Sequence, residues 1–260
     1  MSCITLLSDL GLSDAPVAIA RGVLMQHVPG ATMVDISHEV QPFNHAQAAY
    51  LLSGVYKHFP QGTIHLLVFD LFSDTAPRVI LSEHQGQYFL CADNGLLPSA
   101  LRALPQRSWL CLELAGEDDY VAWLHAAGRT IAMLHQHKKP AEAGLAEYTL
   151  KPGKINEARI TGRIAECDVI HIDQYENVVT NMTRQRFEAL RGAGRFTLQF
   201  MLVEEVREIS SHYQDVREGY KLCRFNSNGY LEICVNHGNA AGLYGLQIGS
   251  RHNEIKIFFE

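Results

Sequence analysis

The stretch ITLLSDLGLSDAPVAIARGVLMQHVPGATMVDISH, residues 4–38, decides the fold. Its first part, ITLLSDL (4–10), is a short run of apolar residues that predicts a strand. APVAIARGVLMQHV (15–28) then places apolar residues at helical spacing until Pro29 ends the pattern. TMVDISH (32–38) is a second strand-like run. This order predicts a strand, a helix and a parallel strand, the unit from which α/β sheets are built.

The same alternation continues over the first 150 residues. AQAAYLLSGVYKHF (46–59) predicts a helix, and TIHLLVFD (63–70) predicts a strand that is apolar almost throughout, as expected when both faces of a sheet are covered. The further elements that we expect are a hairpin around Gly86 in VILSEHQGQYFLCAD (79–93), a short helix in LPSALRAL (97–104), a strand in WLCLEL (109–114) and a longer helix in YVAWLHAAGRTIAMLHQ (120–136). Residues 1–150 are therefore predicted to form an α/β domain with a mainly parallel sheet.

A second domain is predicted over residues 151–260, because the polar segment 135–158, with two prolines and two glycines, marks a domain boundary. The β-rich runs beyond it are RITGRIAECDVIHID (159–173), FTLQFMLVEEV (196–206), YKLCRF (220–225), YLEICV (230–235) and EIKIFFE (254–260). The turn Asn226-Ser-Asn-Gly229 between two of these runs is a hairpin signal. The pattern predicts an all-β, antiparallel, barrel-like domain.

Composition and charge argue against several classes of ligand and partner. The net charge of −6 argues weakly against a nucleic-acid partner, because nucleic-acid binding usually requires a basic face, and we expect no such partner. The six cysteines form no CxxC pair and no zinc spacing, so we expect reduced core thiols and no metal site. No apolar run approaches the roughly 18 residues of a membrane span, and no basic leader precedes the first strand, so we expect a cytoplasmic protein without membrane contact.

Three aspartates, Asp9, Asp35 and Asp70, stand at the ends of the first three predicted strands. The carboxyl ends of parallel strands meet at one edge of a sheet, so these carboxylates predict a small-molecule site there. The alternative is that some of them only cap helices or end strands. The glycine fingerprint of a dinucleotide site and the GxxxxGK[ST] motif of a P-loop are both absent, which argues against those ligands.

Six blocks of the sequence carry a resemblance to a known family: SDLGLSDAPVAIARG (8–22), VDISHEVQPFNHAQAA (34–49), FPQGTIHLLVFD (59–70), ADNGLL (92–97), IDQYENVVTN (172–181) and FNSNGYLEICVNHGNAA (225–241). In this order they resemble the S-adenosylmethionine (SAM) hydroxide/halide adenosyltransferases, which include SAM hydrolases, fluorinases and chlorinases. The resemblance implies a homotrimer that binds SAM between the first domain of one subunit and the second domain of its neighbour. Water or a halide then displaces methionine from C5′ of SAM, without a cofactor or metal.

The resemblance also assigns residues to the ligand. Asp9 matches a carboxylate that accepts two hydrogen bonds from the ribose diol, with Asp14 and the turn at Gly11 supporting it. The other substrate-binding positions that it implies are Phe43 and Asn94 near the ribose, Asp173 and Ser227 at the amino and carboxylate ends of methionine, Tyr175 and Asn177 on the adenine, and Ser73, Asn228 and His237. An alternative remains for two of them, since the turn around Ser227 suits a hairpin without ligand and Tyr175 suits packing in a barrel.

The sequence departs from the hydrolase pattern where catalysis is expected. That pattern implies an Asp after the third strand, an Arg shortly after it and a His in an FHGRD-like segment. Asp70 matches the first, DLFSDTAPR (70–78) retains only Arg78 from a glycine-containing DPGVGTxRR stretch, and YVAWLHA (120–126) offers only His125. From the three residues that remain, we predict that the protein hydrolyses SAM with Asp70, Arg78 and His125 as catalytic residues. The alternatives are a trimer that binds SAM or adenosine without turnover, and a structural oligomer with no ligand.

Overall fold

The computed structural model describes residues 3–74, 77–114, 119–136 and 138–260. The chain divides into two compact units, Met1–Ile155 and Asn156–Glu260. The division lies within the polar segment 135–158, in which the sequence analysis places the domain boundary. Each unit has its own hydrophobic core.

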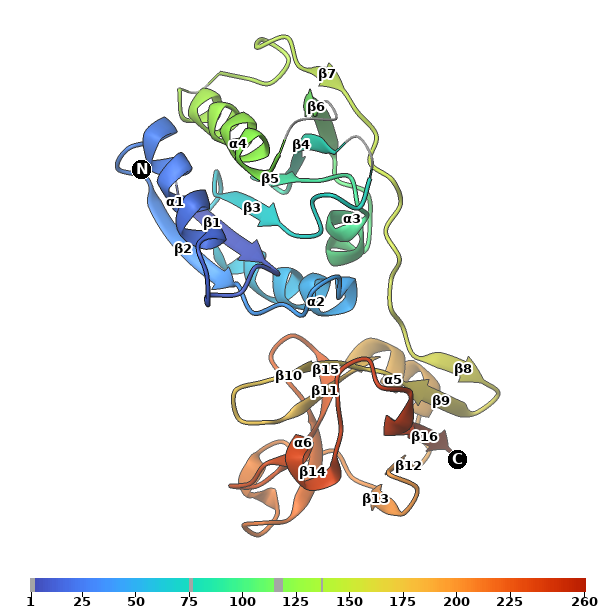
Figure 1. The fold of residues 1–260 in the computed structure, drawn as a ribbon. Coiled ribbons are helices and arrows are strands. Elements are labelled where there is room, and N and C mark those ends of the chain that lie inside the picture. The colour runs from blue at the N-terminus through green and yellow to red at the C-terminus, as the bar shows by residue number, and fades with distance from the viewer. Residues whose placement is uncertain (1–2, 75–76, 115–118, 137) are drawn as a thin grey trace. The chain divides into compact units, whose positions relative to one another are not determined.

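The N-terminal unit contains a seven-stranded sheet of order β2-β1-β3-β5-β4-β6-β7 (Figure 1). Its strands are β1 (Cys3–Ser8), β2 (Thr32–Ser37), β3 (Ile64–Val68), β4 (Arg78–His84), β5 (Gln87–Cys91), β6 (Arg107–Glu113) and β7 (Ala146–Glu147). Strands β2, β1, β3 and β5 run parallel, whereas β4, β6 and β7 add antiparallel pairs at one side. The predicted α/β domain is confirmed, as is the hairpin around Gly86, which joins β4 and β5.

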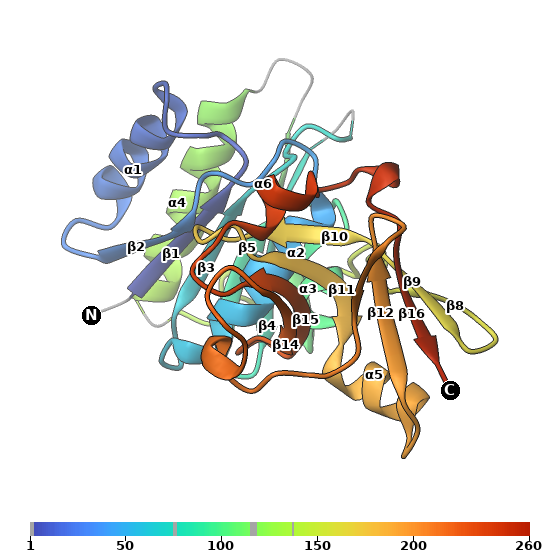
Figure 2. The same cartoon turned by 90° about the horizontal axis from the view of Figure 1, so that it is seen from below.

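Helices cover both faces of this sheet, and Figure 2 shows two of them, α1 and α4, together on one side. The helices are α1 (Pro16–His27), α2 (His45–Val55) with the 3-10 turn η1 (Tyr56–His58), α3 (Leu96–Leu101) and α4 (Tyr120–His135). Leu24 of α1 and Trp123 of α4 are fully buried in one core, and Leu52 of α2 is fully buried in the other. Because both faces are covered, every residue of β3 is buried.

The C-terminal unit consists of two antiparallel sheets, of orders β10-β11-β15-β14 and β13-β12-β16-β9-β8. Its elements are β8 (Arg159–Thr161), β9 (Ile164–Cys167), β10 (Val169–Ile172), β11 (Val178–Thr183), α5 (Arg184–Arg191), β12 (Phe196–Phe200), β13 (Glu204–Val206), η2 (Tyr213–Asp215), β14 (Lys221–Phe225), β15 (Tyr230–Val235), α6 (Ala240–Tyr244), η3 (Arg251–Asn253) and β16 (Ile255–Phe259). The predicted β-rich domain is confirmed, including the hairpin from β14 to β15. The core is centred on the fully buried ring of Phe187, against which Phe196, Phe225 and Phe259 pack edge to face.

Three properties of the described residues bear on function. All six cysteines are free thiols. Within the described ranges, no group of three or more His, Cys, Asp or Glu side chains is placed to hold a metal ion. None of the helices in those ranges combines the length and the apolar character that a membrane crossing requires.

Candidate functional site

The loop that carries Asp9 is fixed to the end of the neighbouring strand β2. The Ser8 hydroxyl and Nδ1 of His38 lie 2.6 Å apart, and the backbone N–H of Gly11 donates to the His38 carbonyl at 2.7 Å. Gly11 has φ +70°, a left-handed conformation that favours glycine, so the turn suits this residue. These contacts hold Asp9 at the carboxyl end of β1.

Ser8, His38 and Asp35 lie in the order of a nucleophilic triad, because His38 Nε2 is 3.1 Å from Asp35 Oδ1. Ser8, however, is only 1% exposed and cannot reach a substrate. Burial, followed by the charge of Arg21, lowers the pKa of His38, which favours the neutral imidazole. Asp35 also pairs with Arg21. Asp35 therefore has charged partners within the protein, as the structural alternative expects, and its contact with a ligand stays a prediction.

Exposed apolar side chains lie in the loops at the same end of the sheet as Asp9. The backbone N–H of Phe43 donates to the Asp9 carboxylate at 3.4 Å, and Phe43 has φ 63°, a strained conformation for a non-glycine residue. Leu12 is 64% exposed, Phe43 72% and Phe72 50%, and they lie in the loops that follow β1, β2 and β3. Asp14 is exposed in the turn before α1. The carboxyl end of the sheet thus combines a carboxylate with exposed apolar side chains.

Asp70 follows β3, the strand that pairs with β1, and its backbone and side chain are both held. The side-chain amide of Asn94 donates to the carbonyls of Phe69 at 2.8 Å and Asp70 at 3.2 Å. Asp70 has φ 43° and a side chain that is 13% exposed. Its carboxylate lies 3.1 Å from Nε2 of His45, the first residue of α2. Asp70 and Asn94, which the sequence predicts, are therefore brought together.

His45 is the residue of this cluster that the sequence analysis missed. It lies inside the block at 34–49, directly after the helix cap Asn44, whose side chain accepts from the Gln47 N–H. A cap at the carboxyl end of the sheet was the available signal, because the first residue of the capped helix must then lie near the ends of the strands.

Arg78 is bound to carboxylates on the protein. Its Nε donates to Glu113 at 2.8 Å, and a second guanidinium nitrogen lies 3.6 Å from Asp74. Ser73, which is exposed, lines a small pocket together with Asp74 and Arg78. The structure thus places Arg78 beside Ser73, with its positive charge balanced by neighbouring acids.

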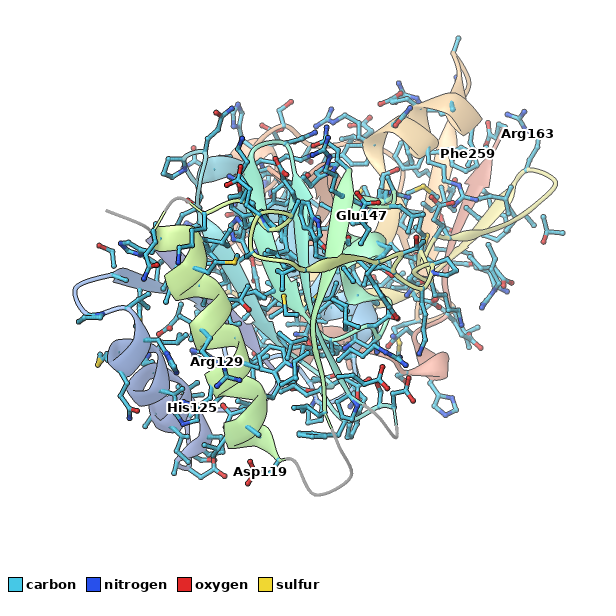
Figure 3. The ribbon with its side chains drawn as sticks, turned by 90° about the horizontal axis from the view of Figure 1, so that it is seen from above. Asp119, His125, Arg129, Glu147, Arg163 and Phe259 are labelled. Carbon is cyan, nitrogen blue, oxygen red and sulfur yellow. The ribbon has the colours of Figure 1, made fainter. Side chains whose placement is uncertain are left out.

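His125 lies in the helical layer of the N-terminal unit. Its Nδ1 is 3.0 Å from Nε2 of His27, and the two rings meet edge to face between α4 and α1. Figure 3 labels His125 along α4, which begins after the cap Asp119. Burial, followed by the charge of His125, lowers the pKa of His27. The contact that the structure gives His125 is thus to another helix, and it is not brought together with Asp70.

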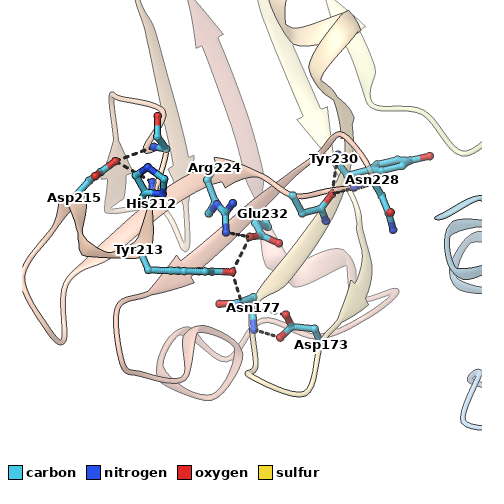
Figure 4. A network of polar contacts seen from close by, with 11 residues as sticks. Asp173, Asn177, His212, Tyr213, Asp215, Arg224, Asn228, Tyr230 and Glu232 are labelled. Atoms are coloured by element: carbon cyan, nitrogen blue, oxygen red, sulfur yellow. Dashed lines mark hydrogen bonds and ion pairs between the residues drawn. The ribbon is translucent and has the colours of Figure 1, made fainter. Parts of the chain in front are cut away.

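In the C-terminal unit, Asp173 organises a tight turn (Figure 4). Its carboxylate accepts hydrogen bonds from the N–H of Tyr175 at 2.9 Å, from the N–H of Asn177 at 2.8 Å and from the Asn177 side-chain amide at 2.9 Å. Such a side-chain turn fixes the backbone locally. Tyr175, at its tip, is 79% exposed, so the turn presents an aromatic ring to solvent while Asn177 is buried beneath it.

A partly buried polar network connects this turn to β14, β15 and η2, as the dashed lines in Figure 4 show. The Tyr213 hydroxyl donates to Glu232 at 3.1 Å and lies 3.4 Å from the Asn177 amide, and Arg224 stacks on the Tyr213 ring. Burial raises the pKa of Glu232 and raises that of Tyr213 to about 12. The sequence analysis did not single out Tyr213, Arg224 or Glu232, because no motif links them.

The remaining predicted positions lie on surface turns of the C-terminal unit. The Asn226 side chain accepts from the N–H groups of Asn228 and Tyr230, each at 3.1 Å, which shapes the hairpin that exposes Ser227. His237 follows β15 with φ 53°, and its side chain is 69% exposed. These residues are accessible, and their contact with a ligand stays a prediction.

Two family models match the chain: the SAM hydroxide adenosyltransferase N-terminal domain over residues 4–130 and the C-terminal domain over residues 167–253. The chain belongs to the SAM hydroxide adenosyltransferase family. This family member is 29% identical over 255 residues to the (R)-S-adenosyl-L-methionine hydrolase of Thermus thermophilus, covering 94% of this chain and 95% of that protein. It is 31% identical over 297 residues to a fluorinase of an Actinoplanes species, covering 95% of each. A solved structure of a conserved Thermotoga maritima protein shares its fold, with a TM-score of 0.81 and 23% identity over 99% of this chain and all of that one.

Proposed function

We propose that this protein hydrolyses SAM to adenosine and methionine. The observation that carries the proposal is the Asp70 carboxylate, fixed at the end of β3 by Asn94 and His45, next to the strand whose end carries Asp9. The near full-length similarity to (R)-S-adenosyl-L-methionine hydrolases supports the same reaction.

In the proposed reaction, the oxygen of one water molecule forms a bond to C5′ of SAM while the bond from C5′ to sulfur breaks. The electron pair of that bond goes to sulfur, so methionine leaves as a neutral thioether, and Asp70 accepts the proton that the water loses. A sulfonium is a good leaving group, so orientation and exclusion of bulk water supply much of the acceleration. We propose that no metal or cofactor takes part and that SAM is the only organic substrate.

We assign the ribose to the N-terminal unit, and the adenine and methionine ends to the C-terminal unit. Asp9 accepts two hydrogen bonds from the ribose diol, and Phe43 packs against the ribose. The exposed ring of Tyr175 offers a stacking surface for adenine, and Asp173 and Ser227 take the methionine end. Asn177 is buried and donates to the Asp173 carboxylate, so we assign it to the support of Asp173 and not to direct contact with the adenine.

We propose a homotrimer in which each ligand binds between the N-terminal unit of one subunit and the C-terminal unit of its neighbour. Large exposed apolar groups such as Phe43, Phe72 and Tyr175 support this, because such groups mark contact surfaces. Sedimentation equilibrium tests it, since a trimer of this chain has three times the mass of 29.1 kDa. We place the protein in the cytoplasm, where reducing conditions suit six free thiols.

The second candidate function is binding of SAM or adenosine without turnover. It is favoured by the contacts of Arg78 with Glu113 and of His125 with His27, which occupy two of the predicted catalytic groups. Calorimetry with SAM, followed by chromatography of the same mixture, separates the two functions. Heat of binding with release of adenosine, abolished in Asp70→Asn, supports hydrolysis. Binding without any product supports the silent binder.

A further inference from the structure

The His45 imidazole is placed to control the orientation of the Asp70 carboxylate. Its Nε2 lies 3.1 Å from Asp70 Oδ2, and within the described ranges this is the one side-chain hydrogen bond to that carboxylate. The His45 side chain is 34% exposed and that of Asp70 is 13% exposed, so the pair lies at the surface of the sheet end and not in the core.

The imidazole packs against an aromatic ring, and the helix start that carries it is capped. Its ring meets the ring of Phe69 edge to face, with centroids 4.9 Å apart and an interplanar angle of 89°. Asn44 caps α2 by accepting from the Gln47 N–H at 3.1 Å, which fixes the helix start that carries His45. Phe69 precedes Asp70 in the chain, so the residue that orients the imidazole also belongs to the segment that carries the carboxylate.

We propose that His45 is the positioning residue for Asp70. The inference rests on the proposed function. The Nε2–H of His45 donates to Oδ2 and holds the carboxylate so that its other oxygen is directed at the attacking water. His45 itself does not touch the substrate, and the proton of the water goes to Asp70.

A purely structural role for His45 makes a different prediction. A side chain that only stabilises the first turn of α2 affects the free energy of unfolding, and its loss leaves the turnover of folded protein unchanged. A hydrogen bond that orients Asp70 affects kcat and leaves KM nearly unchanged, because it acts on the water and not on SAM. It is also restored by any side chain that places an N–H at the same point.

The experiment measures adenosine release from SAM by the full-length protein and three variants. We expect His45→Ala to lower kcat by roughly 10- to 100-fold, the range for one lost hydrogen bond to a charged group, with KM within about threefold of the wild-type value. His45→Gln retains an N–H close to the position of Nε2, so we expect its kcat within about threefold of wild type. His58→Ala, which removes an exposed histidine of η1, serves as the control and retains full activity.

The outcomes distinguish the inference from the function on which it rests. If the wild type forms no adenosine, both are wrong. If the wild type turns over SAM and folded His45→Ala does so equally fast, only the inference is wrong. Equal losses in His45→Ala and His45→Gln also overturn it, because an amide donor then fails to replace the imidazole.

Discussion

Asn94 connects the stability of the sheet end to the position of Asp70. Its amide nitrogen donates to the carbonyls of Phe69 and Asp70, and its Oδ1 accepts from the Leu96 N–H at 3.1 Å. Asn94→Ala removes all three bonds, each of which contributes about 0.5 to 1.5 kcal/mol net. Because Asn94 is only half-buried, water replaces part of these hydrogen bonds in the variant. We therefore expect the free energy of unfolding to fall by about 2 kcal/mol, which lowers Tm by about 4 to 8 °C in a chain of this size.

The same substitution is expected to slow turnover. Asp70 holds φ 43°, a conformation that persists only where its surroundings enforce it, and Asn94 supplies a bond to its carbonyl. We expect kcat to fall by at least roughly tenfold, as expected when a reacting group is misplaced. The assay combines thermal unfolding with chromatographic detection of adenosine.

A matched control exists in the C-terminal unit. Asn253 is a buried amide that exchanges two hydrogen bonds with the backbone of Gln247, at 2.7 and 3.0 Å. Asn253→Ala is expected to cost similar stability and to leave kcat unchanged. The reasoning is refuted if Asn94→Ala is destabilised yet retains wild-type kcat, or if the two variants lose activity equally.

Three further predictions concern binding and pH. Asp9→Ala removes two charge-assisted hydrogen bonds to the ribose and should weaken SAM binding at least roughly 100-fold in calorimetry; unchanged affinity would contradict this assignment. Tyr175→Ala should leave Tm unchanged, because the ring is 79% exposed, and should raise KM by roughly 5- to 100-fold, the range for loss of one base-stacking contact; an unchanged KM would remove Tyr175 from the adenine site. Burial lowers the pKa of His65 to about 4 in the folded protein. Between pH 6.5 and 4 the unfolded chain therefore binds a proton at this residue more readily than the folded protein does. The free energy of unfolding should fall by up to about 3 kcal/mol as the pH drops through that range. His65→Gln should flatten this part of the curve in urea titrations, and a curve that keeps its slope would assign the effect to other groups.

The positions of Asp9 and Asp70 were predictable because strand periodicity and the geometry of parallel sheets place strand ends at one edge. The predicted strands and helices of the first unit correspond to the observed ones for the same reason. Helix α5 was not predicted, because its sequence RQRFEALR has a single fully buried residue, Phe187, and gives little apolar periodicity.

The pairing of His45 with Asp70 was not predictable, because the two residues are 25 positions apart and neither carries a motif that names the other. His125 was predicted from its place in the chain alone. The apolar face of α4 turns toward the sheet, as the buried Trp123 and Ile131 show, and His125 is thereby directed to His27 of α1. The packing of α4 against α1 thus determines the surroundings of His125, and this packing cannot be predicted from the local sequence.

The central claim is that water displaces methionine from C5′ of SAM. A reaction in water enriched in oxygen-18, analysed by mass spectrometry, tests it most directly. Hydrolysis at C5′ predicts adenosine that carries one heavy oxygen at its 5′-hydroxyl and methionine that carries none, with no product from Asp70→Asn. Absence of adenosine, or heavy oxygen in methionine alone, would contradict the account.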